Sequence, residues 1–172
     1  MDKTVSKKKI AIFGGSFDPP HLGHQRLLSQ VLASGVVEEI WLMPAFVSPW
    51  KRQLAMAKDR LGMCKLLVGK GIKVSDLEIK RQGKSYTIDT VRELKKRFPD
   101  DKFYWLIGSD MVKDLNKWHK ADQLFREIEF LVFPRTKTSS TDVRERVKRG
   151  LPISGLVQKE IEKYIKEGEL YR

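Results

Sequence analysis

The chain has 172 residues, of which 41% are hydrophobic and 33% are charged. This composition is ordinary for a soluble protein, and the length allows one domain with a substantial core. No apolar stretch approaches the roughly 18 residues of a membrane span, and the basic amino terminus does not have the form of a signal peptide. The single cysteine excludes an intrachain disulfide. We therefore predict one cytoplasmic domain over residues 1–172, with a basic flexible tail over residues 1–8.

The net charge of the chain is +12, from 34 Lys and Arg against 22 Asp and Glu. Much of the excess lies in clusters at residues 7–9, 95–97 and 144–149. Such a charge favours anionic partners such as nucleotides, RNA or acidic membrane surfaces. Solvated helix faces and a basic tail explain the clusters more simply, so neither nucleic acid nor a membrane is expected as a partner.

Strands and helices are predicted to alternate along the chain. The predicted extended segments are residues 9–13, 36–43, 72–79, 103–107 and 130–133. The predicted helices carry apolar stripes within residues 27–32, 54–68 and 88–98, and Cys64 lies on the apolar face of the second, where we expect it in the core. This alternation implies a parallel sheet covered by helices on both faces, with ligands at the carboxyl ends of its strands. We predict a Rossmann-like, doubly wound α/β fold with a helical carboxyl terminus.

The run Gly-Gly-Ser-Phe-Asp-Pro-Pro-His-Leu-Gly-His, from Gly14 to His24, lies where the first strand turns into a helix. Gly14 and Gly15 permit tight or positive-φ backbone and close approach of a ligand. The helix start presents unpaired N–H groups and a positive dipole end, which attract anions. His21 and His24 can donate hydrogen bonds to phosphate oxygens at the same corner. The run therefore favours a nucleotide phosphate site and phosphoryl or nucleotidyl transfer.

The same run has simpler explanations. Gly-Gly and Pro-Pro are common in ordinary turns, and the two histidines could cap the helix or lie exposed. A zinc site at these histidines would need further ligands, and only His119 and Cys64 remain of the suitable types. No protein metal site is predicted.

Two further loops follow the second and fourth predicted strands and should meet the first loop at one edge of the sheet. They are residues 44–52 and the Gly108-Ser109-Asp110 turn. Asp110 could accept hydrogen bonds from ribose hydroxyls or cap the helix that follows, and the residues alone leave both explanations open.

Two helix starts later in the chain carry polar residues that are typical of caps. Ser85 or Thr87 is predicted to cap the helix over residues 88–98. Near the carboxyl end, Ser139 to Asp142 fits the [ST]-x-x-[DE] capping pattern. Arg144, one turn into that helix, could bind the same phosphate chain as the helix N-terminus.

Two of these runs resemble a known family. The run from Gly14 to His24 is similar to the signature of bacterial nicotinate-mononucleotide adenylyltransferases, in the nucleotidyltransferase superfamily marked by H-x-G-H. Residues 138–144 resemble the second signature of the superfamily, I-S-S-T-x-x-R, with Thr138 in place of isoleucine. Related phosphopantetheine adenylyltransferases and cytidylyltransferases usually carry Gly-Thr-Phe-Asp, so Gly-Ser-Phe-Asp at residues 15–18 favours the nicotinate branch.

The resemblance implies transfer of AMP from ATP to nicotinate mononucleotide in NAD biosynthesis, giving deamido-NAD and pyrophosphate, with Mg²⁺ accompanying ATP. It implies that charge in the reaction is stabilised by His21, His24, Lys51 and Arg144. It implies ATP contacts from Gly14, Gly15, Ser16, Phe17, His21, His24, Gly108, Asp110, Arg135, Ser140, Thr141 and Arg144. It implies mononucleotide contacts from Ser16, Phe17, Lys51, Thr87, Trp118 and His119.

The nicotinate ring has its own expected contacts. By resemblance, backbone amides at Thr87 and His119 receive the carboxylate, and Trp118 stacks on the pyridine ring. Without the family context, Trp118 would be interpreted as a core residue.

The chain also departs from the family pattern in two places. Ser48-Pro49-Trp50-Lys51 stands where the family usually has Pro-Pro-His followed by Lys or Arg. Val132 to Arg135 is followed almost at once by Ser139, where members normally have a few dozen more residues, so this is a short variant that lacks a helix and a strand. The shortening could alter the sheet edge, oligomer contacts or activity, and homo-oligomerisation stays open.

Two other functions remain as alternatives. One is the same transfer to nicotinamide mononucleotide or to another phosphorylated acceptor such as phosphopantetheine. The other is a non-catalytic nucleotide- or RNA-binding protein, for which the net charge of +12 and the short segment are the motives.

Overall fold

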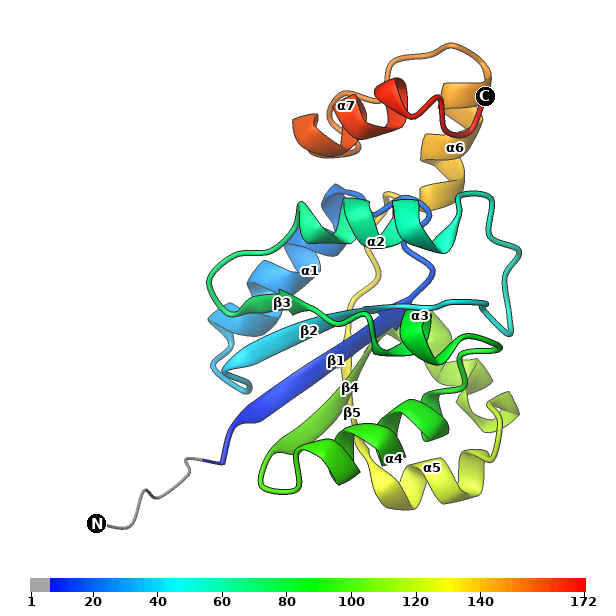
Figure 1. Cartoon of the computed structure of the whole chain (residues 1–172). Coiled ribbons are helices and arrows are strands. Elements are labelled where there is room, and N and C mark those ends of the chain that lie inside the picture. Colours follow the sequence, from blue (N-terminus) through cyan, green and yellow to red (C-terminus); the bar gives the residue numbers. More distant parts are fainter. Residues whose placement is uncertain (1–6) are drawn as a thin grey trace.

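The computed structural model describes residues 7–172 and contains a five-stranded parallel sheet (Figure 1). The strand order is β3-β2-β1-β4-β5, with the first strand in the centre. The chain adds β2 and β3 on one side of β1 and then β4 and β5 on the other, as in doubly wound folds. The predicted Rossmann-like fold is confirmed. The strands are β1 Lys9–Gly15, β2 Glu39–Pro44, β3 Ile72–Val74, β4 Lys102–Gly108 and β5 Glu129–Phe133.

Helices cover both faces of the sheet. Figure 1 shows α1 and α2 on one side, α4 and α5 on the other, and α6 and α7 stacked beyond α2 at the end of the molecule that holds the carboxyl terminus. The predicted helical carboxyl terminus is confirmed. The helices are α1 Leu22–Ala33, α2 Ala57–Lys65, α3 Leu77–Arg81, α4 Thr87–Arg97, α5 Ala121–Glu127, α6 Ser140–Lys148, α7 Lys159–Glu167 and a 3₁₀ helix, η1, over Ser109–Lys117.

The two faces of the sheet hold two separate hydrophobic clusters. Side chains of a strand alternate between faces, and along β4 Tyr104 and Leu106 join one cluster while Phe103 and Trp105 join the other. The first cluster also takes residues of α1, α2, α6 and α7, and the second takes residues of α3, α4 and α5. Cys64 is fully buried in the first cluster, as predicted, and burial raises the pKa of its thiol.

The predicted extended segment over residues 72–79 is wrong beyond β3. The strand ends at Val74, and the backbone N–H of Lys80 donates to the carbonyl of Asp76 at 2.8 Å as α3 forms. Ser75 and Asp76 break the strand because such short polar residues favour turns and helix starts. The turn lets Leu77 enter the second cluster.

The second predicted strand and the helix after it are shorter than expected. Val36 is 43% exposed and precedes β2, while Leu54 and Val68 are 57% and 53% exposed and lie outside α2. These apolar residues extend the hydrophobic pattern beyond the elements that it predicts. The buried residues of α2 are Arg60, Met63 and Cys64.

The predicted flexible tail over residues 1–8 extends one residue too far, to Lys8. Residues 1–6 lie outside the described part of the chain. Lys8 is held at the amino end of the central strand, since its backbone N–H donates to Asp101 Oδ1 at 3.2 Å and its Nζ lies 3.0 Å from Glu39 Oε1. Its carbonyl accepts from the N–H of Lys102 at 2.8 Å.

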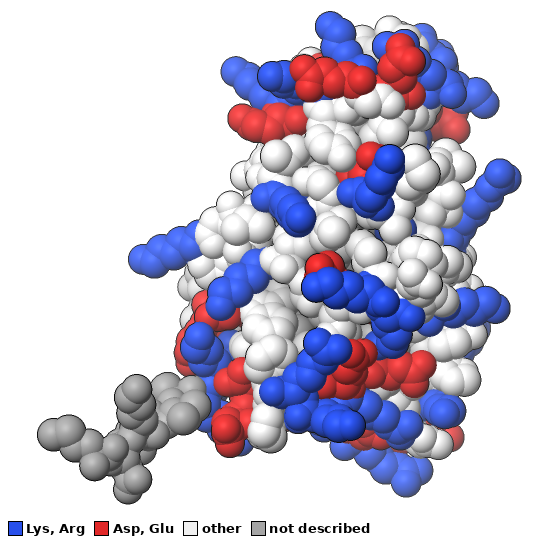
Figure 2. Space-filling model, viewed as in Figure 1, with Lys and Arg blue, Asp and Glu red and all other residues white. Residues whose placement is uncertain are grey.

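Charge is distributed over the surface. Figure 2 shows Lys and Arg spread over the visible face with Asp and Glu between them. The cluster at residues 95–97 is exposed on α4, where Arg97 pairs with Glu93, and on α6 Arg146 Nε lies 3.7 Å from Asp142 Oδ1. These are solvated helix faces. Among residues 7–172, no helix is both long and apolar enough to cross a membrane.

Candidate functional site

A cavity of about 770 Å³ opens at the carboxyl ends of the strands. Loops after β1, β2, β4 and β5 and the start of α6 contribute to its walls, which confirms the predicted convergence. Every residue predicted for the site lines this cavity. They are Gly14, Gly15, Ser16, Phe17, His21, His24, Lys51, Thr87, Gly108, Asp110, Trp118, His119, Arg135, Ser140, Thr141 and Arg144.

Of the two glycines at the end of β1, Gly14 is required for packing rather than for unusual backbone, whereas a Cβ at Gly15 would make ordinary contact with the ring of Phe17. Both belong to the extended strand and neither has positive φ, so the positive-φ backbone that glycine permits is not used at either position. A Cβ on Gly14 would overlap the indole of Trp105, which is buried beneath the strand end. The left-handed residue of the loop is Phe17, with φ of 49°. Its ring is buried edge-on to Phe13 at 5.4 Å, and this packing holds the conformation.

His21 and His24 cap α1 reciprocally. His21 is the N-cap, and its Nδ1 accepts from the backbone N–H of His24 at 3.3 Å, while His24 Nδ1 accepts from the N–H of His21 at 3.1 Å. The capping explanation is therefore confirmed, and both rings also line the cavity. Because each Nδ1 acts as an acceptor, each neutral ring carries its proton on Nε2. Each histidine thus keeps one N–H donor that the capping does not use.

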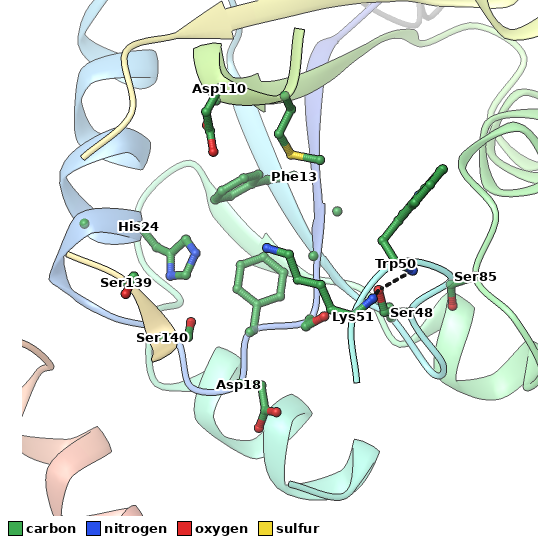
Figure 3. Close-up of a pocket in the computed structure, with 18 of the residues that line it drawn as sticks. Phe13, Asp18, His24, Ser48, Trp50, Lys51, Ser85, Asp110, Ser139 and Ser140 are labelled. Atoms are coloured by element: carbon green, nitrogen blue, oxygen red, sulfur yellow. Dashed lines mark hydrogen bonds between the residues drawn. The ribbon is translucent and has the colours of Figure 1, made fainter. Parts of the chain in front are cut away.

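Burial keeps both imidazoles neutral. It lowers the pKa of His21 to about 4, with a further contribution from the charge of Lys51. For His24, burial followed by the neighbouring His21 and then Lys51 holds the pKa well below its usual range. The two rings stack at 3.7 Å between centroids. In Figure 3 the Lys51 side chain extends into the cavity on the side that faces His24.

The loop after β2 presents Lys51 and Trp50. The hydroxyl of Ser48 accepts from the backbone N–H groups of Lys51 and Trp50, at 3.1 and 3.3 Å (Figure 3). The Ser48 N–H donates to Gln53 Oε1 at 3.0 Å. Trp50 is 54% exposed and lines the cavity where a histidine was expected from the resemblance. Sequence reasoning assigned it no role.

Two buried charged residues beneath these loops were also missed. Asp18 accepts from the N–H groups of Leu54 at 2.6 Å and Ala55 at 3.1 Å. Arg60 is 1% exposed, and its guanidinium donates to the carbonyls of Ser16, Phe46 and Ala55 at 2.8, 2.9 and 3.1 Å. The position of Asp18 within the signature run could have indicated a role for it. Nothing in the sequence indicated a role for Arg60, because an arginine in an amphipathic helix is expected to face solvent.

The start of α6 is capped and attached to the signature loop. Ser139 is the N-cap and accepts from the N–H of Asp142 at 3.1 Å, as predicted. Ser140 Oγ donates to the carbonyl of Pro19 at 2.8 Å. Arg144 donates from Nη1 to the carbonyl of Asp18 at 2.7 Å. The second signature is thereby held against the first.

The end of β4 places Asp110 beside Arg135. Gly108 is the N-cap of η1 and no side-chain cap is made there, so the capping explanation for Asp110 is wrong. Its carboxylate Oδ2 lies 3.7 Å from Arg135 Nη1, and both residues line the cavity. The N–H of Arg135 donates to Ser109 Oγ at 3.3 Å, which joins the ends of β4 and β5.

Aromatic residues form the wall near the start of α4. Trp118 is partly buried, packs edge-on to Phe130 at 6.1 Å and also lines the cavity, so it contributes to both core and site. Tyr86 stacks on His119 at 4.3 Å between ring centroids.

The predicted caps Ser85 and Thr87 are wrong. Tyr86 is the N-cap without a side-chain bond, and Ser85 Oγ instead accepts from the N–H of Phe46 at 3.0 Å.

The part of the chain that the structure describes holds no group of three His, Cys, Asp or Glu side chains placed to bind a metal ion. Of the carboxylates that line the cavity, Asp18 accepts hydrogen bonds from backbone N–H groups and Glu78 accepts from Thr90 Oγ1 at 2.6 Å. The third carboxylate of the wall, Asp110, lies 3.7 Å from Arg135 Nη1.

Comparison with known proteins agrees with this geometry. Residues 12–155 match the cytidylyltransferase-like family. The fold and the site define a nucleotidyltransferase of that class. A probable nicotinate-nucleotide adenylyltransferase of Shouchella clausii is 40% identical, over 95% of this chain and 97% of the relative. The nicotinate-nucleotide adenylyltransferase of Bacillus subtilis is 38% identical, over 95% and 98%.

Solved structures show the same fold. A putative nicotinate-nucleotide adenylyltransferase from Vibrio parahaemolyticus superposes with a TM-score of 0.82 at 24% identity, over 96% of each chain. The nicotinic acid mononucleotide adenylyltransferase of Plasmodium falciparum complexed with NaAD gives a TM-score of 0.79 at 20% identity, over 95% of this chain and 97% of that one. From the sequence relatives, the chain belongs to the nicotinate-nucleotide adenylyltransferases.

The chain is shorter than a relative that it matches. The alignment with the Shouchella clausii protein spans 186 positions, more than the 172 residues present here, so the relative has residues without counterpart in this chain. Here β5 ends at Phe133 and α6 begins at Ser140, with only the segment 134–139 between them.

Proposed function

We propose that this chain transfers AMP from ATP to nicotinate mononucleotide, giving deamido-NAD and pyrophosphate in cytoplasmic NAD biosynthesis. The observation that carries the proposal is that both signature runs and the residues expected at the pyridine ring line one cavity. Its volume of about 770 Å³ lies in the range of sites for small molecules and cofactors.

The reaction needs positioning and charge stabilisation rather than a protein nucleophile. A phosphate oxygen of the mononucleotide attacks the α-phosphorus of ATP, a new P–O–P bond forms, and the bond to the leaving pyrophosphate breaks. Negative charge grows on the α-phosphate and on pyrophosphate in the transition state. Donors that are already fixed toward these oxygens lower the barrier most. His21, His24, Lys51 and Arg144 have this role in the proposal.

The ATP contacts follow from the two signature loops and the end of β4. Gly14 to Phe17 bring backbone close to the phosphates, and Ser140 and Thr141 lie at the N-terminus of α6, where N–H groups favour anions. Asp110 accepts from the ribose hydroxyls, Gly108 lets the sugar approach, and Arg135 neutralises nearby charge.

The mononucleotide contacts lie across the cavity. Thr87 is the first residue of α4, where backbone N–H groups lack intrahelical partners and can receive the nicotinate carboxylate together with the amide of His119. The free face of Trp118 stacks on the pyridine ring. Ser16, Phe17 and Lys51 contact the mononucleotide phosphate. Nicotinamide mononucleotide lacks the carboxylate, and phosphopantetheine lacks the pyridine ring.

Mg²⁺ belongs to the substrate in this proposal. Mg²⁺ at nucleotide sites is commonly held by substrate phosphates and water with one or two carboxylates. Of the three carboxylates that line the cavity, Asp18 and Glu78 are already hydrogen-bonded and Asp110 lies beside Arg135. The ion would arrive on the triphosphate, shield its charge and leave with pyrophosphate.

Trp118→Ala tests the assignment of the pyridine pocket. We expect the Kd for nicotinate mononucleotide to rise about fivefold, since an aromatic pair contributes about 1 kcal/mol. The Kd for ATP should stay unchanged. Trp118→Phe retains a flat face and should bind close to normally. Titration calorimetry measures the Kd of each ligand for the wild type and both variants. An alanine variant with normal mononucleotide affinity would remove Trp118 from the site.

A further inference from the structure

The carboxyl-terminal tail folds back onto the signature loop. After α7 ends at Glu167, Glu169 and Tyr171 take left-handed backbone with φ of 49° and 65°, and the N–H of Leu170 donates to the carbonyl of Ile165 at 3.0 Å. Left-handed backbone is rare outside glycine, so contacts must hold it. Leu170 and Tyr171 pack against the first hydrophobic cluster, and the Tyr171 hydroxyl donates to Asp18 Oδ1 at 2.7 Å.

Asp18 is the residue on which four segments meet. Asp18 is 2% exposed. Its carboxylate accepts from the hydroxyl of Tyr171 in the tail and from the N–H groups of Leu54 and Ala55, which follow Lys51 in the loop after β2. Its carbonyl accepts from Arg144 on α6. The side chain therefore joins the loop that carries Lys51 to the loop that carries the histidines.

Arg60 completes this arrangement from below. Its guanidinium donates to carbonyls of the loop after β1, at Ser16, and of the loop after β2, at Phe46 and Ala55. Burial lowers the pKa of Arg60, and the charge of Asp18 opposes this effect. Burial and the same charge raise the pKa of Tyr171, so its hydroxyl keeps its proton and remains a donor. A buried carboxylate that loses one of its donors is left under-satisfied at a cost in free energy, which destabilises the closed arrangement that its remaining bonds hold.

We propose that Tyr171 is a positioning residue for the adenylyl transfer, acting through Asp18 to hold the loop with Trp50 and Lys51 against His21 and His24. The inference rests on the proposed function for its kinetic part. Its structural part rests on the hydrogen bonds alone. Loss of the Tyr171 hydroxyl should let residues 48–55 move, which weakens the contact of Lys51 with phosphate.

Tyr171→Phe tests the proposal, and Tyr164→Phe is its matched control. Tyr164 lies on α7, and its hydroxyl also donates to a carboxylate, that of Asp59 on α2, at 3.2 Å, outside the Asp18 network. Trypsin cleavage after Lys51 and Arg52 reports mobility of the loop without any turnover. Pyrophosphate release reports kcat and the KM for nicotinate mononucleotide. Both variants keep the aromatic ring and its packing.

For Tyr171→Phe we expect severalfold faster cleavage after Lys51 and Arg52 and a severalfold higher KM, while Tyr164→Phe matches the wild type in both. Equal cleavage of Tyr171→Phe and the wild type overturns the proposal. So does a lower Tm with unchanged kinetics, because that is the result of a merely structural contact. If the wild type transfers no adenylyl group at all, the proposed function fails, whereas faster cleavage of Tyr171→Phe still supports the attachment of the loop.

Discussion

The two histidines of the signature loop combine a structural role with the proposed catalytic one. Each Nδ1 accepts the backbone N–H of the other residue, which fixes both rings at the start of α1. The same bonds leave Nε2–H as the remaining donor of each neutral ring. A neutral N–H can donate to phosphate oxygens whose negative charge grows in the transition state, and it does so without adding a positive charge that would hold the product.

His24→Ala should lower kcat far more than it weakens ATP binding. The lost donor acts mainly on charge that develops in the transition state, and removal of one such donor costs about 10²–10³ in rate. Pyrophosphate release at saturating substrates measures kcat, and calorimetry measures the ATP Kd. A circular dichroism melt controls for the lost half of the capping pair. Unchanged kcat would refute the role.

His21→Asn should flatten the pH dependence of stability. In the unfolded chain the imidazole of His21 takes up a proton near pH 6.5, but in the folded loop it does so only near pH 4. The stabilisation is therefore complete above pH 6.5 and is lost as the pH falls toward 4, by about 3 kcal/mol for this shift. Asparagine caps a helix without titrating in this range. Urea unfolding between pH 4 and 7 measures the slope, and an equally steep slope in the variant would contradict the account.

At the scale of elements, the strand ends determine where the chemistry gathers. β1, β2, β4 and β5 run parallel, so their carboxyl ends bring their loops to one edge of the sheet. The start of α6 reaches the same cavity because Ser140 and Arg144 bind carbonyls of the signature loop. The two signatures, far apart in sequence, thus form one wall.

Ser139→Ala tests how far this wall depends on a helix cap. Loss of the bond to the N–H of Asp142 should lower the free energy of unfolding by about 1 kcal/mol. ATP binding should weaken as well, because Ser140, Thr141 and Arg144 follow this cap. Ser139→Asn keeps a capping oxygen and serves as the control. Equal urea midpoints for the alanine variant and the wild type would show that the cap contributes nothing.

The strongly patterned elements were predictable and the exceptions have physical causes. The continuous apolar run at residues 103–107 predicted β4, which is buried between two layers of helices. The extended run at 72–79 failed because Ser75 and Asp76 end the strand although apolar residues continue. The need for glycine at position 14 was predicted for the wrong reason, since a neighbour from β4, Trp105, occupies the space of its Cβ.

At the scale of the whole molecule, the sequence predicted the site residues that belong to a signature run, but not the residues that reach the site through contacts distant in the chain. His21, His24 and Arg144 were expected at the site from their runs, and their roles there stay predictions. Tyr171 lies 153 residues from Asp18 in the chain, and Arg60 binds only backbone carbonyls. Such partners carry no local pattern. The prediction of a single domain over residues 1–172 also stays a prediction, and the first cluster, which joins β1 to α7, favours it.

The central claim is the transfer of AMP to nicotinate mononucleotide, and one measurement tests it most directly. Purified protein is given ATP and Mg²⁺ with nicotinate mononucleotide, nicotinamide mononucleotide or phosphopantetheine, and pyrophosphate release is followed. We expect the highest kcat/KM with nicotinate mononucleotide, because helix α4 offers N–H donors to a carboxylate. Preference for another acceptor would contradict the specificity, and no turnover with any of them, together with tight and salt-dependent RNA binding, would contradict the enzyme itself.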